Sequence, residues 1–483
     1  MREHRDHGCL PDWRTEEMPE PLPITTRNVL KTIGPGAILL AGSIGGGEWI
    51  VGPMTAVKYG PGILWVATAG ILLQWLFNME AIRYTLYTGE PVLTGIMRLR
   101  PGAKVWGALY IVLGILQLAT PALALGCASV LFAAGSNGLP DASGADRGTV
   151  MWISYAVLGL TVLLLLSGKS IERMLERLSW AMVIFIFAFL TLANILFVPF
   201  ASWIQTAKGF LIPSRLPENM DIVLLGVFAA TAGSGGLGNL AISNWCRDKG
   251  FGMGRWVGSI GGILAEGHTE LSSTGCVFRA TKENLRRWSI WWKYSLIDQT
   301  ALWAFGCVVG MFLNVNLALQ IVPVDKQLTG YEAGTFQAQF MAERLWSGFW
   351  FLALFNGFWI LFSTQLGNMD CLTRVVSDVC WSGWPKLQKL TSSRLYARWL
   401  MVFLVWGVVA LTIGDNVVAL FKILGLLASP ILAIGALQIL LLNRRFLPKE
   451  IQPPVWRQLG LILCCMTFTA LSAASFYDLL TKN

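Results

Sequence analysis

Apolar stretches separated by short polar segments run through the whole chain. An α-helix needs about 20 apolar residues to cross the hydrocarbon core of a bilayer, and eleven stretches approach or exceed that length. Because a helix satisfies its own backbone hydrogen bonds in lipid, the pattern predicts an all-α polytopic membrane protein with 11 transmembrane helices. The predicted spans cover residues 33–57, 63–84, 105–134, 150–166, 179–200, 222–245, 294–322, 346–366, 399–413, 417–442 and 459–480.

Lys and Arg are concentrated in alternate connecting segments. The segments after the second, fourth, sixth, eighth and tenth spans are rich in them, as with Arg98, Arg100 and Lys104 after the second, whereas the intervening segments carry at most two. Basic residues in short loops stay on the cytosolic side of a membrane. The alternation therefore predicts a cytosolic N-terminus and a C-terminus on the opposite side.

The composition agrees with a membrane protein and disfavours other classes. Hydrophobic residues make up 54% of the chain and charged residues 13%, against roughly 25% charged residues in soluble domains. The net charge of +9 lies in segments between spans, so it indicates anionic lipid rather than nucleic acid as the partner. The nine Cys show no metal-ligand spacing, and a catalytic role for the isolated His268 is not favoured.

Glycine clusters interrupt the first and sixth spans at corresponding places. The first span contains Gly45, Gly46 and Gly47, followed by Glu48, and residues 230–239 of the sixth contain four more glycines. Each glycine disfavours a helix by about 1 kcal/mol relative to Ala, and unwound backbone at membrane depth survives where it lines a cavity. We therefore predict that helices 1 and 6 are broken. Close helix packing through small residues is the alternative.

The two glycine clusters begin two halves of five spans each. With an odd number of spans per half, the second half inserts upside down, which predicts a 5+5 inverted repeat with a binding site near the midplane. The predicted parts are a cytosolic tail (1–30), repeat one (31–200), repeat two (221–443) with a cytosolic loop (246–293), and a cytosolic linker with the eleventh span (444–483). The G-x-G-x-x-G pattern of residues 233–238 lies in an apolar span, so it does not indicate a dinucleotide site.

Charged side chains within the spans are functional candidates, because a charge in the bilayer is costly. Glu48 is expected to bind a cation, carry a proton or pair with a base. Glu80 and Arg83 share one face of the second span, which fits either a gating pair or a structural ion pair. Lys422 is a coupling candidate, with a side chain that snorkels to the interface as the alternative. Two further acids are expected at the membrane interfaces, Asp298 and Asp370.

Several short motifs resemble the natural resistance-associated macrophage protein (Nramp) family of metal-ion transporters. Residues 34–36 (GPG) are similar to the start of the family's helix one, and residues 45–49 (GGGEW) align with its helix-one break, Asp-Pro-Gly-Asn followed by Trp. Residues 83–89 (RYTLYTG) match the spacing of an Arg and a Thr-Gly pair in its helix two, and Arg398 is similar to a basic residue that opens its helix nine. The resemblance extends from about residue 30 to residue 442.

The resemblance implies the two-repeat fold of the amino acid–polyamine–organocation superfamily and a cation site at the broken helices. The family's metal-binding Asp aligns with Gly45 and its Asn with Glu48, while its Met-Pro-His in helix six has no counterpart. A site with oxygen ligands alone suits a hard cation such as hydrated magnesium, with Glu48 as the expected metal ligand. The expected substrate-binding residues are Ser43, Gly45, Gly46, Gly47, Glu48, Thr231, Gly233, Ser234, Gly235 and Asn239, and the candidates for coupling or gating are Glu80, Arg83, Arg398 and Lys422.

Three functions remain open from the sequence. The leading prediction is an Nramp-related secondary transporter that moves a divalent cation across the lipid bilayer by alternating access. The second is a transporter of a small organic solute, such as an amino acid, on the same fold. The third is a membrane sensor or assembly subunit that moves nothing and binds a partner through loop 246–293. No nucleophile–base pair or cofactor motif is recognisable, so we expect neither an enzyme nor a cofactor, and the oligomeric state stays open.

Overall fold

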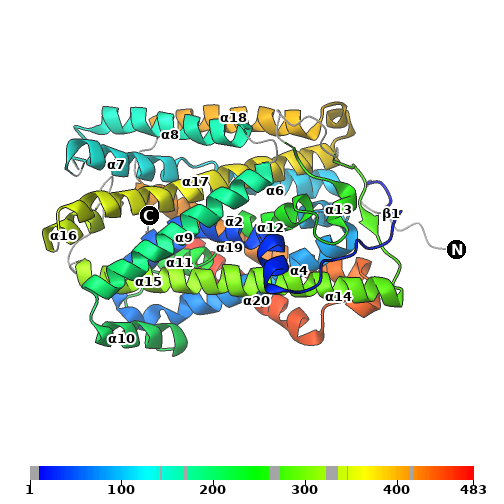
Figure 1. Cartoon of the computed structure of the whole chain (residues 1–483), viewed down its shortest axis with the longest axis horizontal. Coiled ribbons are helices and arrows are strands. Elements are labelled where there is room, and N and C mark those ends of the chain that lie inside the picture. Colours follow the sequence, from blue (N-terminus) through cyan, green and yellow to red (C-terminus); the bar gives the residue numbers. More distant parts are fainter. Residues whose placement is uncertain are drawn as a thin grey trace.

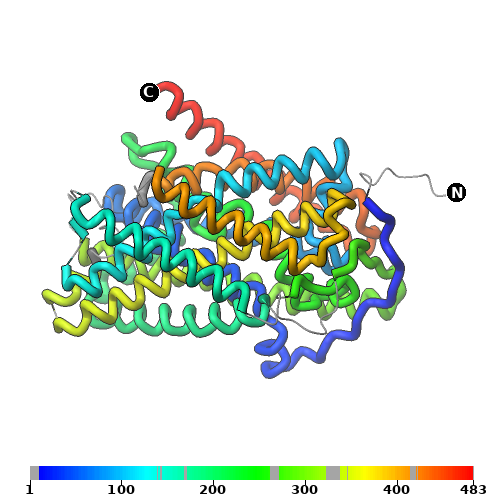
Figure 2. Tube along the Cα trace, turned by 90° about the horizontal axis from the view of Figure 1, so that it is seen from above, coloured from blue at the N-terminus to red at the C-terminus, as the bar shows by residue number. Residues whose placement is uncertain are grey.

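The structure, a computed structural model, describes residues 10–138, 140–141, 144–167, 171–261, 271–322, 336–344, 346–413 and 417–482. It is a bundle of helices that run roughly along one long axis (Figure 1). Seen from above (Figure 2), the C-terminal end of α20 projects beyond the bundle. The elements are β1 (Arg14–Thr15), α1 (Thr26–Thr32), α2 (Pro35–Ser43), η1 (Ile44–Val51), α3 (Gly52–Tyr59), η2 (Pro61–Ile63), α4 (Trp65–Thr88), α5 (Val92–Ile96), α6 (Ala103–Leu118), α7 (Ala122–Ser136), α8 (Arg147–Ser167), α9 (Ile171–Phe197), α10 (Phe200–Leu211), α11 (Ile222–Thr231), α12 (Leu237–Asp248), α13 (Gly254–Val257), β2 (Cys276–Val277), α14 (Lys282–Ile297), η3 (Asp298–Ala304), α15 (Phe305–Ile321), α16 (Phe336–Arg344), α17 (Gly348–Gly383), η5 (Pro385–Lys389), α18 (Ser392–Ile413), α19 (Val417–Phe446), η6 (Lys449–Ile451) and α20 (Val455–Lys482).

The predicted spans are all present in the described part of the chain. Ten helices are long and apolar enough to cross a membrane, and the sixth predicted span appears as two shorter helices, α11 and α12. The largest differences from prediction are at the seventh and eighth spans, where Lys282–Ile321 and Gly348–Gly383 continue far into segments predicted as loops. A hydropathy pattern detects only the apolar part of a helix. Both helices continue as polar segments that pack against other parts of the protein, so they are longer than the apolar stretches predicted. His268 lies outside the described residues.

The first span lies at the centre of the bundle. Within its most apolar window, 83% of the residues of Pro35–Tyr59 are buried inside the protein, against 22% for the last span, Val455–Thr481. The first glycine cluster is therefore enclosed by protein, while α20 lies at the periphery. This burial is what allows irregular backbone to persist in the first and sixth spans.

The N-terminal segment packs against one end of the bundle. We call this end, where the N-terminal segment, α13 and β2 lie, the tail end. β1 pairs in parallel with β2, Arg14 opposite Cys276. The guanidinium of Arg98 lies 4.5 Å from the ring centre of Trp13 and donates hydrogen bonds to Glu90. Burial raises the pKa of Glu90, but the charge and hydrogen bonds of Arg98 outweigh burial and place that pKa below its usual value. The tail thus rests on a buried ion pair.

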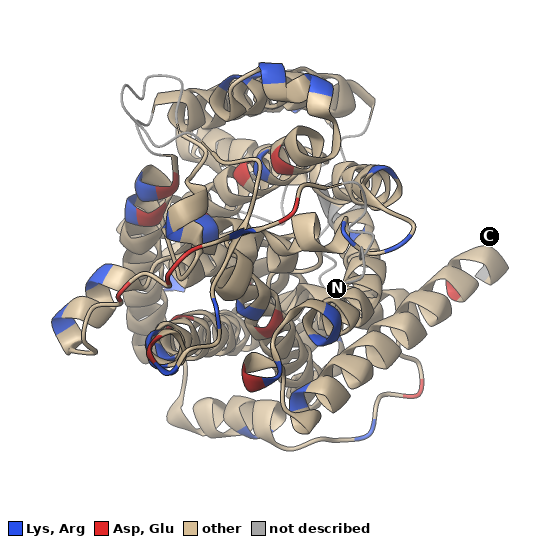
Figure 3. Cartoon of the chain, turned by 90° about the vertical axis from the view of Figure 1, so that its right-hand side faces the viewer, with Lys and Arg blue, Asp and Glu red and all other residues tan. Residues whose placement is uncertain are grey.

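Several charged side chains lie inside the bundle near the tail end, which Figure 3 shows face on with its Lys, Arg, Asp and Glu residues. Asp298 and Asp370 are fully buried among the helices, and their predicted position at the level of the membrane interfaces stays a prediction. Asp298 accepts hydrogen bonds from the backbone N–H groups of Gly34 (2.9 Å) and Gly36 (2.8 Å) at the start of α2. Asp370 pairs with Arg374 at 2.8 Å. In each case specific hydrogen bonds or an ion pair offset the cost of burying the carboxylate, and hydropathy does not reveal these partners.

Glu80 lies in a buried triad with two arginines. Arg83, three residues on, donates to its carboxylate at 2.7 Å, and Arg457 at the start of α20 donates at 3.0 Å. Both guanidinium groups also lie over the ring of Trp292, at 4.1 and 5.0 Å from its centre. The triad joins the last span to α4, which is the structural alternative considered for Glu80 and Arg83.

We predict that Glu80→Gln destabilises the protein by about 3–5 kcal/mol, because two buried guanidinium groups lose their shared counter-ion. The exposed triad of Glu283 with Arg286 and Arg287 provides a matched control. Exposed pairs contribute about 0–1 kcal/mol, so Glu283→Gln should leave the thermal unfolding temperature in detergent almost unchanged. Equal shifts in the two variants would contradict a structural role for the buried triad.

Candidate functional site

The first glycine cluster is helical, contrary to the prediction of a break. α2 continues without interruption into the π-helix η1 and then into α3. The hydroxyl of Thr364, from α17, accepts a hydrogen bond from Gly45 N (2.9 Å) and lies 3.1 Å from Ala41 O, two groups that an α-helix would join. A side chain inserted there opens the α-helical ladder, and the chain continues with wider π turns. A Cβ on Gly45 would lie 2.4 Å from the inserted oxygen.

The second glycine cluster does break its helix, as predicted. α11 ends at Thr231 and α12 begins at Leu237. Between them Gly235 and Gly236 have φ values of +64° and +72°, a region that residues with a Cβ rarely adopt. Two consecutive residues of this kind cannot continue a right-handed helix, so the sixth span is divided into two half-helices.

Two glutamines from neighbouring spans satisfy the interrupted backbone. Gln74 of α4 accepts a hydrogen bond from Gly235 N (3.2 Å) and donates to Ala230 O (2.9 Å). Gln117 of α6 donates to Gly235 O (2.6 Å) and accepts from Leu237 N (3.0 Å). An unpaired backbone group in the membrane interior costs several kcal/mol. The two side chains therefore hold the break in one defined conformation.

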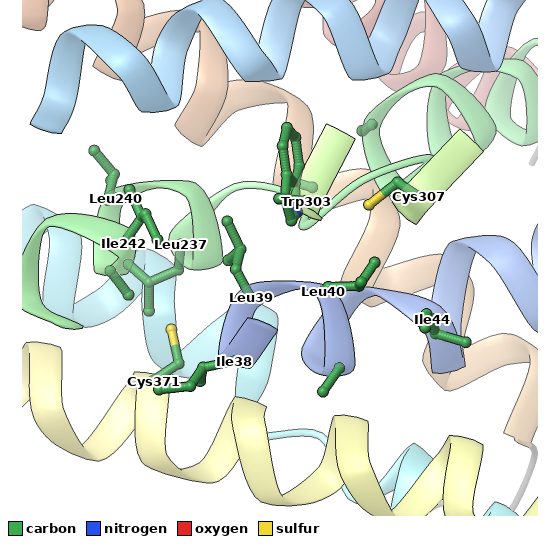
Figure 4. Packing of buried hydrophobic residues seen from close by; sticks show 14 of the residues in the cluster. Ile38, Leu39, Leu40, Ile44, Leu237, Leu240, Ile242, Trp303, Cys307 and Cys371 are labelled. Carbon is green, nitrogen blue, oxygen red and sulfur yellow. The ribbon is translucent and has the colours of Figure 1, made fainter. Parts of the chain in front are cut away.

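The first span and the break are in direct contact. The hydroxyl oxygens of Ser43 and Ser234 are 3.0 Å apart, and the indole N–H of Trp303 donates to Ser234 at 3.1 Å. Trp303 approaches the first span close to α12 (Figure 4). A Cβ on Gly47 would lie 1.6 Å from the carbonyl oxygen of Thr231. Gly47 therefore serves this close approach rather than an unwound helix.

A small cavity of about 20 Å³ lies where these segments meet, enough for one water-sized occupant. The polar groups that line the cavity are hydroxyl, amide and backbone groups, and none of the lining residues is charged. The lining residues are Gly42, Ser43, Gly46, Gly47, Leu118, Thr231, Gly233, Ser234, Thr364, Asn368 and Leu424. The arrangement offers neutral oxygen ligands to a small polar or cationic species.

Six of the ten expected binding residues line this cavity: Ser43, Gly46, Gly47, Thr231, Gly233 and Ser234. Gly45 and Gly235 instead have their backbone groups bonded to Thr364 and to the two glutamines. Asn239 lies further along α12 and donates to Asn78 at 2.9 Å. These three residues do not line the cavity; their hydrogen bonds hold the segments that surround it.

Glu48 is buried behind the cavity rather than in it. Its side chain has no exposed surface, and neither carboxylate oxygen has a nitrogen or oxygen partner among the described residues. The thiol of Cys307, from α15, lies beside the carboxyl group, and Figure 4 shows Cys307 facing the first span. Successive residues of a helix point in different directions, so Glu48 turns toward α15 while its neighbour Gly47 faces the break. Glu48 does not line the cavity that Ser43, Thr231 and Ser234 share, although the thiol of Cys307 lies near both Glu48 and Ser43.

The four candidates for coupling or gating lie away from the cavity. Glu80 and Arg83 belong to the triad with Arg457. Lys422 on α19 and Arg398 on α18 are exposed, consistent with side chains that reach the membrane surface. None of the four lines the cavity.

Three polar residues of the site escaped the sequence analysis: Gln74, Thr364 and Asn368. Each is a polar residue inside an otherwise apolar span, and Thr364 and Asn368 are four positions apart, hence on one helix face. This spacing is the signal that could have identified them. Their partners could not be identified from the sequence, because the contacts join residues up to 323 positions apart.

Comparisons with known proteins support the fold. No known family model matches the chain. An uncharacterized protein of Pasteurella multocida is 25% identical over 171 residues, so the match spans 35% of this chain and 36% of that relative. A variant of the Eremococcus coleocola manganese transporter is similar with a TM-score of 0.69 and 15% identity, covering 95% of this chain and 89% of that one.

Two further solved structures agree with this likeness. The same manganese transporter in complex with an aromatic bis-isothiourea substituted compound has a TM-score of 0.66 at 14% identity, covering 98% of this chain and 90% of that one. MhsT in complex with L-phenylalanine has a TM-score of 0.56 at 14% identity, covering 92% and 97%. The chain thus has the fold of these transporters, which confirms the predicted all-α, polytopic, inverted-repeat architecture; the predicted break of helix 1 is not found, and the exact repeat boundaries remain predictions.

We predict that Gly47→Ala lowers stability by at least about 2 kcal/mol, because its methyl group would force the first span away from Thr231. Gly42→Ala is the control in the same helix, since a Cβ there meets nothing within 4 Å. Thermal unfolding of the purified variants in detergent measures the difference. Similar unfolding temperatures for both variants would show that the first and sixth spans do not touch at Gly47.

Proposed function

We propose that this integral, multi-pass membrane protein is a secondary transporter that moves a small cation through the cavity between the first and sixth spans. The observation that carries the proposal is the small cavity of about 20 Å³ beside a broken helix, lined by uncharged residues with hydroxyl, amide and backbone oxygens. Broken helices near the membrane midplane are where transporters of this architecture bind ions and solutes. The cavity is of ionic size, which favours a cation over an organic solute.

The donor set favours a hard or borderline divalent cation. Hydroxyl, carbonyl and amide oxygens suit magnesium, calcium and manganese, and no sulfur atom belongs to the lining residues. The structural neighbours include a manganese transporter, which supports a metal cargo. The carboxylate of Glu48, one residue beyond the lining residue Gly47, would offset part of the cation's charge from behind the helix.

An amino acid is the second candidate, since MhsT was solved with L-phenylalanine. A cavity of about 20 Å³ is too small for a molecule of that size, so its volume favours a smaller cargo. A sensor that transports nothing is the third. The charge alternation of the connecting segments supports a cytosolic N-terminus, and an enzymatic reaction is not part of the proposal.

Uptake into proteoliposomes tests the proposal, with manganese, magnesium and calcium as cargoes and amino acids as competitors. We expect divalent-cation uptake, and we expect the double variant Ser43→Ala, Ser234→Ala to raise KM by about tenfold or more, since each lost ligand weakens binding by about 1 kcal/mol. Ser154→Ala is the control, because the hydroxyl of this buried serine donates to Val150 O of its own helix, α8, and Ser154 does not line the cavity. Uptake of amino acids alone would favour the second candidate, and no uptake of any solute the third.

We predict that Glu48→Gln lowers cation uptake without lowering thermal stability. The change removes a buried carboxylate that has no nitrogen or oxygen partner in the described part of the chain, and an unpaired buried charge stabilises nothing. Uptake and unfolding temperature measured on the same preparation separate the two effects. Unchanged uptake would remove Glu48 from the mechanism, and a large loss of stability would indicate a structural role.

A further inference from the structure

A second, larger cavity lies at the tail end, apart from the proposed transport site. Its volume is about 570 Å³, within the range of small-molecule sites. Its walls come from α1, the start of α9, the end of α12, and α13. The lining residues are Lys31, Glu172, Arg173, Glu176, Arg177, Arg247, Asp248, Lys249, Gly250, Gly254, Arg255, Gly258 and Ser259.

Some of these charges neutralise one another. Lys249 pairs with Glu176 at 2.6 Å and donates to Ile33 O at 3.1 Å, just before α2. Arg247 pairs with Asp248 at 2.5 Å. Lys249 also interacts electrostatically with the buried carboxyl of Glu172. The acidic residues of the cavity are therefore matched by basic residues of its inner wall.

Three of the four remaining basic residues have no such match among the described residues. Lys31 of α1, Arg177 of α9 and Arg255 of α13 are exposed side chains around the cavity, and none has a hydrogen-bond or ion-pair partner among the described residues. The lining holds six basic and three acidic residues, an excess of three positive charges. Three helices that are far apart in the sequence thus place unpaired basic side chains around one cavity. Basic residues scattered over the surface would not be gathered around a common binding volume.

We infer that this cavity binds a phosphate group, carried either by an anionic lipid or by a soluble phosphate compound. Arg forms bidentate hydrogen bonds with phosphate oxygens, and Lys acts as a point charge. Basic pockets between helices at the cytosolic side of a membrane are suited to phosphate headgroups, and the tail end is the side predicted to be cytosolic. The bound phosphate would join α1, α9 and α13 and so hold the start of the first span. The inference goes beyond the proposed transport function and does not depend on it.

The test compares phosphate binding by the full-length protein and by two triple variants of equal charge. The site variant carries Lys31→Gln, Arg177→Gln and Arg255→Gln. The control variant carries Lys386→Gln, Lys389→Gln and Arg394→Gln, which removes three exposed cations outside the cavity. The probes are inorganic pyrophosphate, followed by thermal unfolding, and phosphatidylglycerol in mixed micelles, followed by native mass spectrometry.

We expect the wild type and the control variant to bind at least one probe, and the site variant to bind it roughly a hundredfold more weakly, since three charge-assisted contacts are lost. Ser259→Phe, which narrows the cavity without altering charge, should also weaken binding. Binding of phosphatidylglycerol without binding of pyrophosphate identifies a lipid headgroup as the ligand. Binding of pyrophosphate, with or without the lipid, shows that the cavity accepts a soluble phosphate compound. Equal binding by the two triple variants, or no binding of either probe by the wild type, would overturn the inference.

Discussion

The hydrogen bonding of interrupted backbone inside the bundle is the constraint on which the rest of the structure depends. In lipid no water replaces a lost helical hydrogen bond, so each irregular segment needs a side chain aimed at it. Gln74 and Gln117 supply these bonds at the break of the sixth span, and Thr364 does so at the first. These three polar residues fix where the backbone departs from an α-helix, and hence where the cavity forms.

The same segments explain why the first span differs from the sixth. In the sixth, two glycines with positive φ interrupt the helix, and two glutamines bond to the interrupted backbone. In the first, one inserted hydroxyl changes the register from α to π and the helix continues. The glycines of the first span serve mainly to admit Thr364 and the carbonyl of Thr231. Similar glycine clusters thus have different structural consequences, because different side chains face them.

The charged residues divide into two groups. Buried charged residues that form ion pairs, such as Glu80 with Arg83 and Arg457, hold helices together at the tail end. Glu48 differs, because it is buried at the centre with no nitrogen or oxygen partner in the described structure. The lining residues of the cavity are uncharged, so the unpaired carboxyl group of Glu48, next to the lining residue Gly47, is the charge on which our transport proposal depends.

The number of spans, the break in the sixth and six of the cavity residues could be predicted from the chain alone, because lipid imposes long apolar stretches and glycine disfavours helix in any context. Three features depend on packing between distant segments: the first span stays helical, Glu48 lies beside Cys307, and Asp298 and Asp370 are buried. These outcomes depend on side chains from distant spans, such as Thr364 opposite Gly45. Local pattern carries no information on which distant residue meets which backbone group.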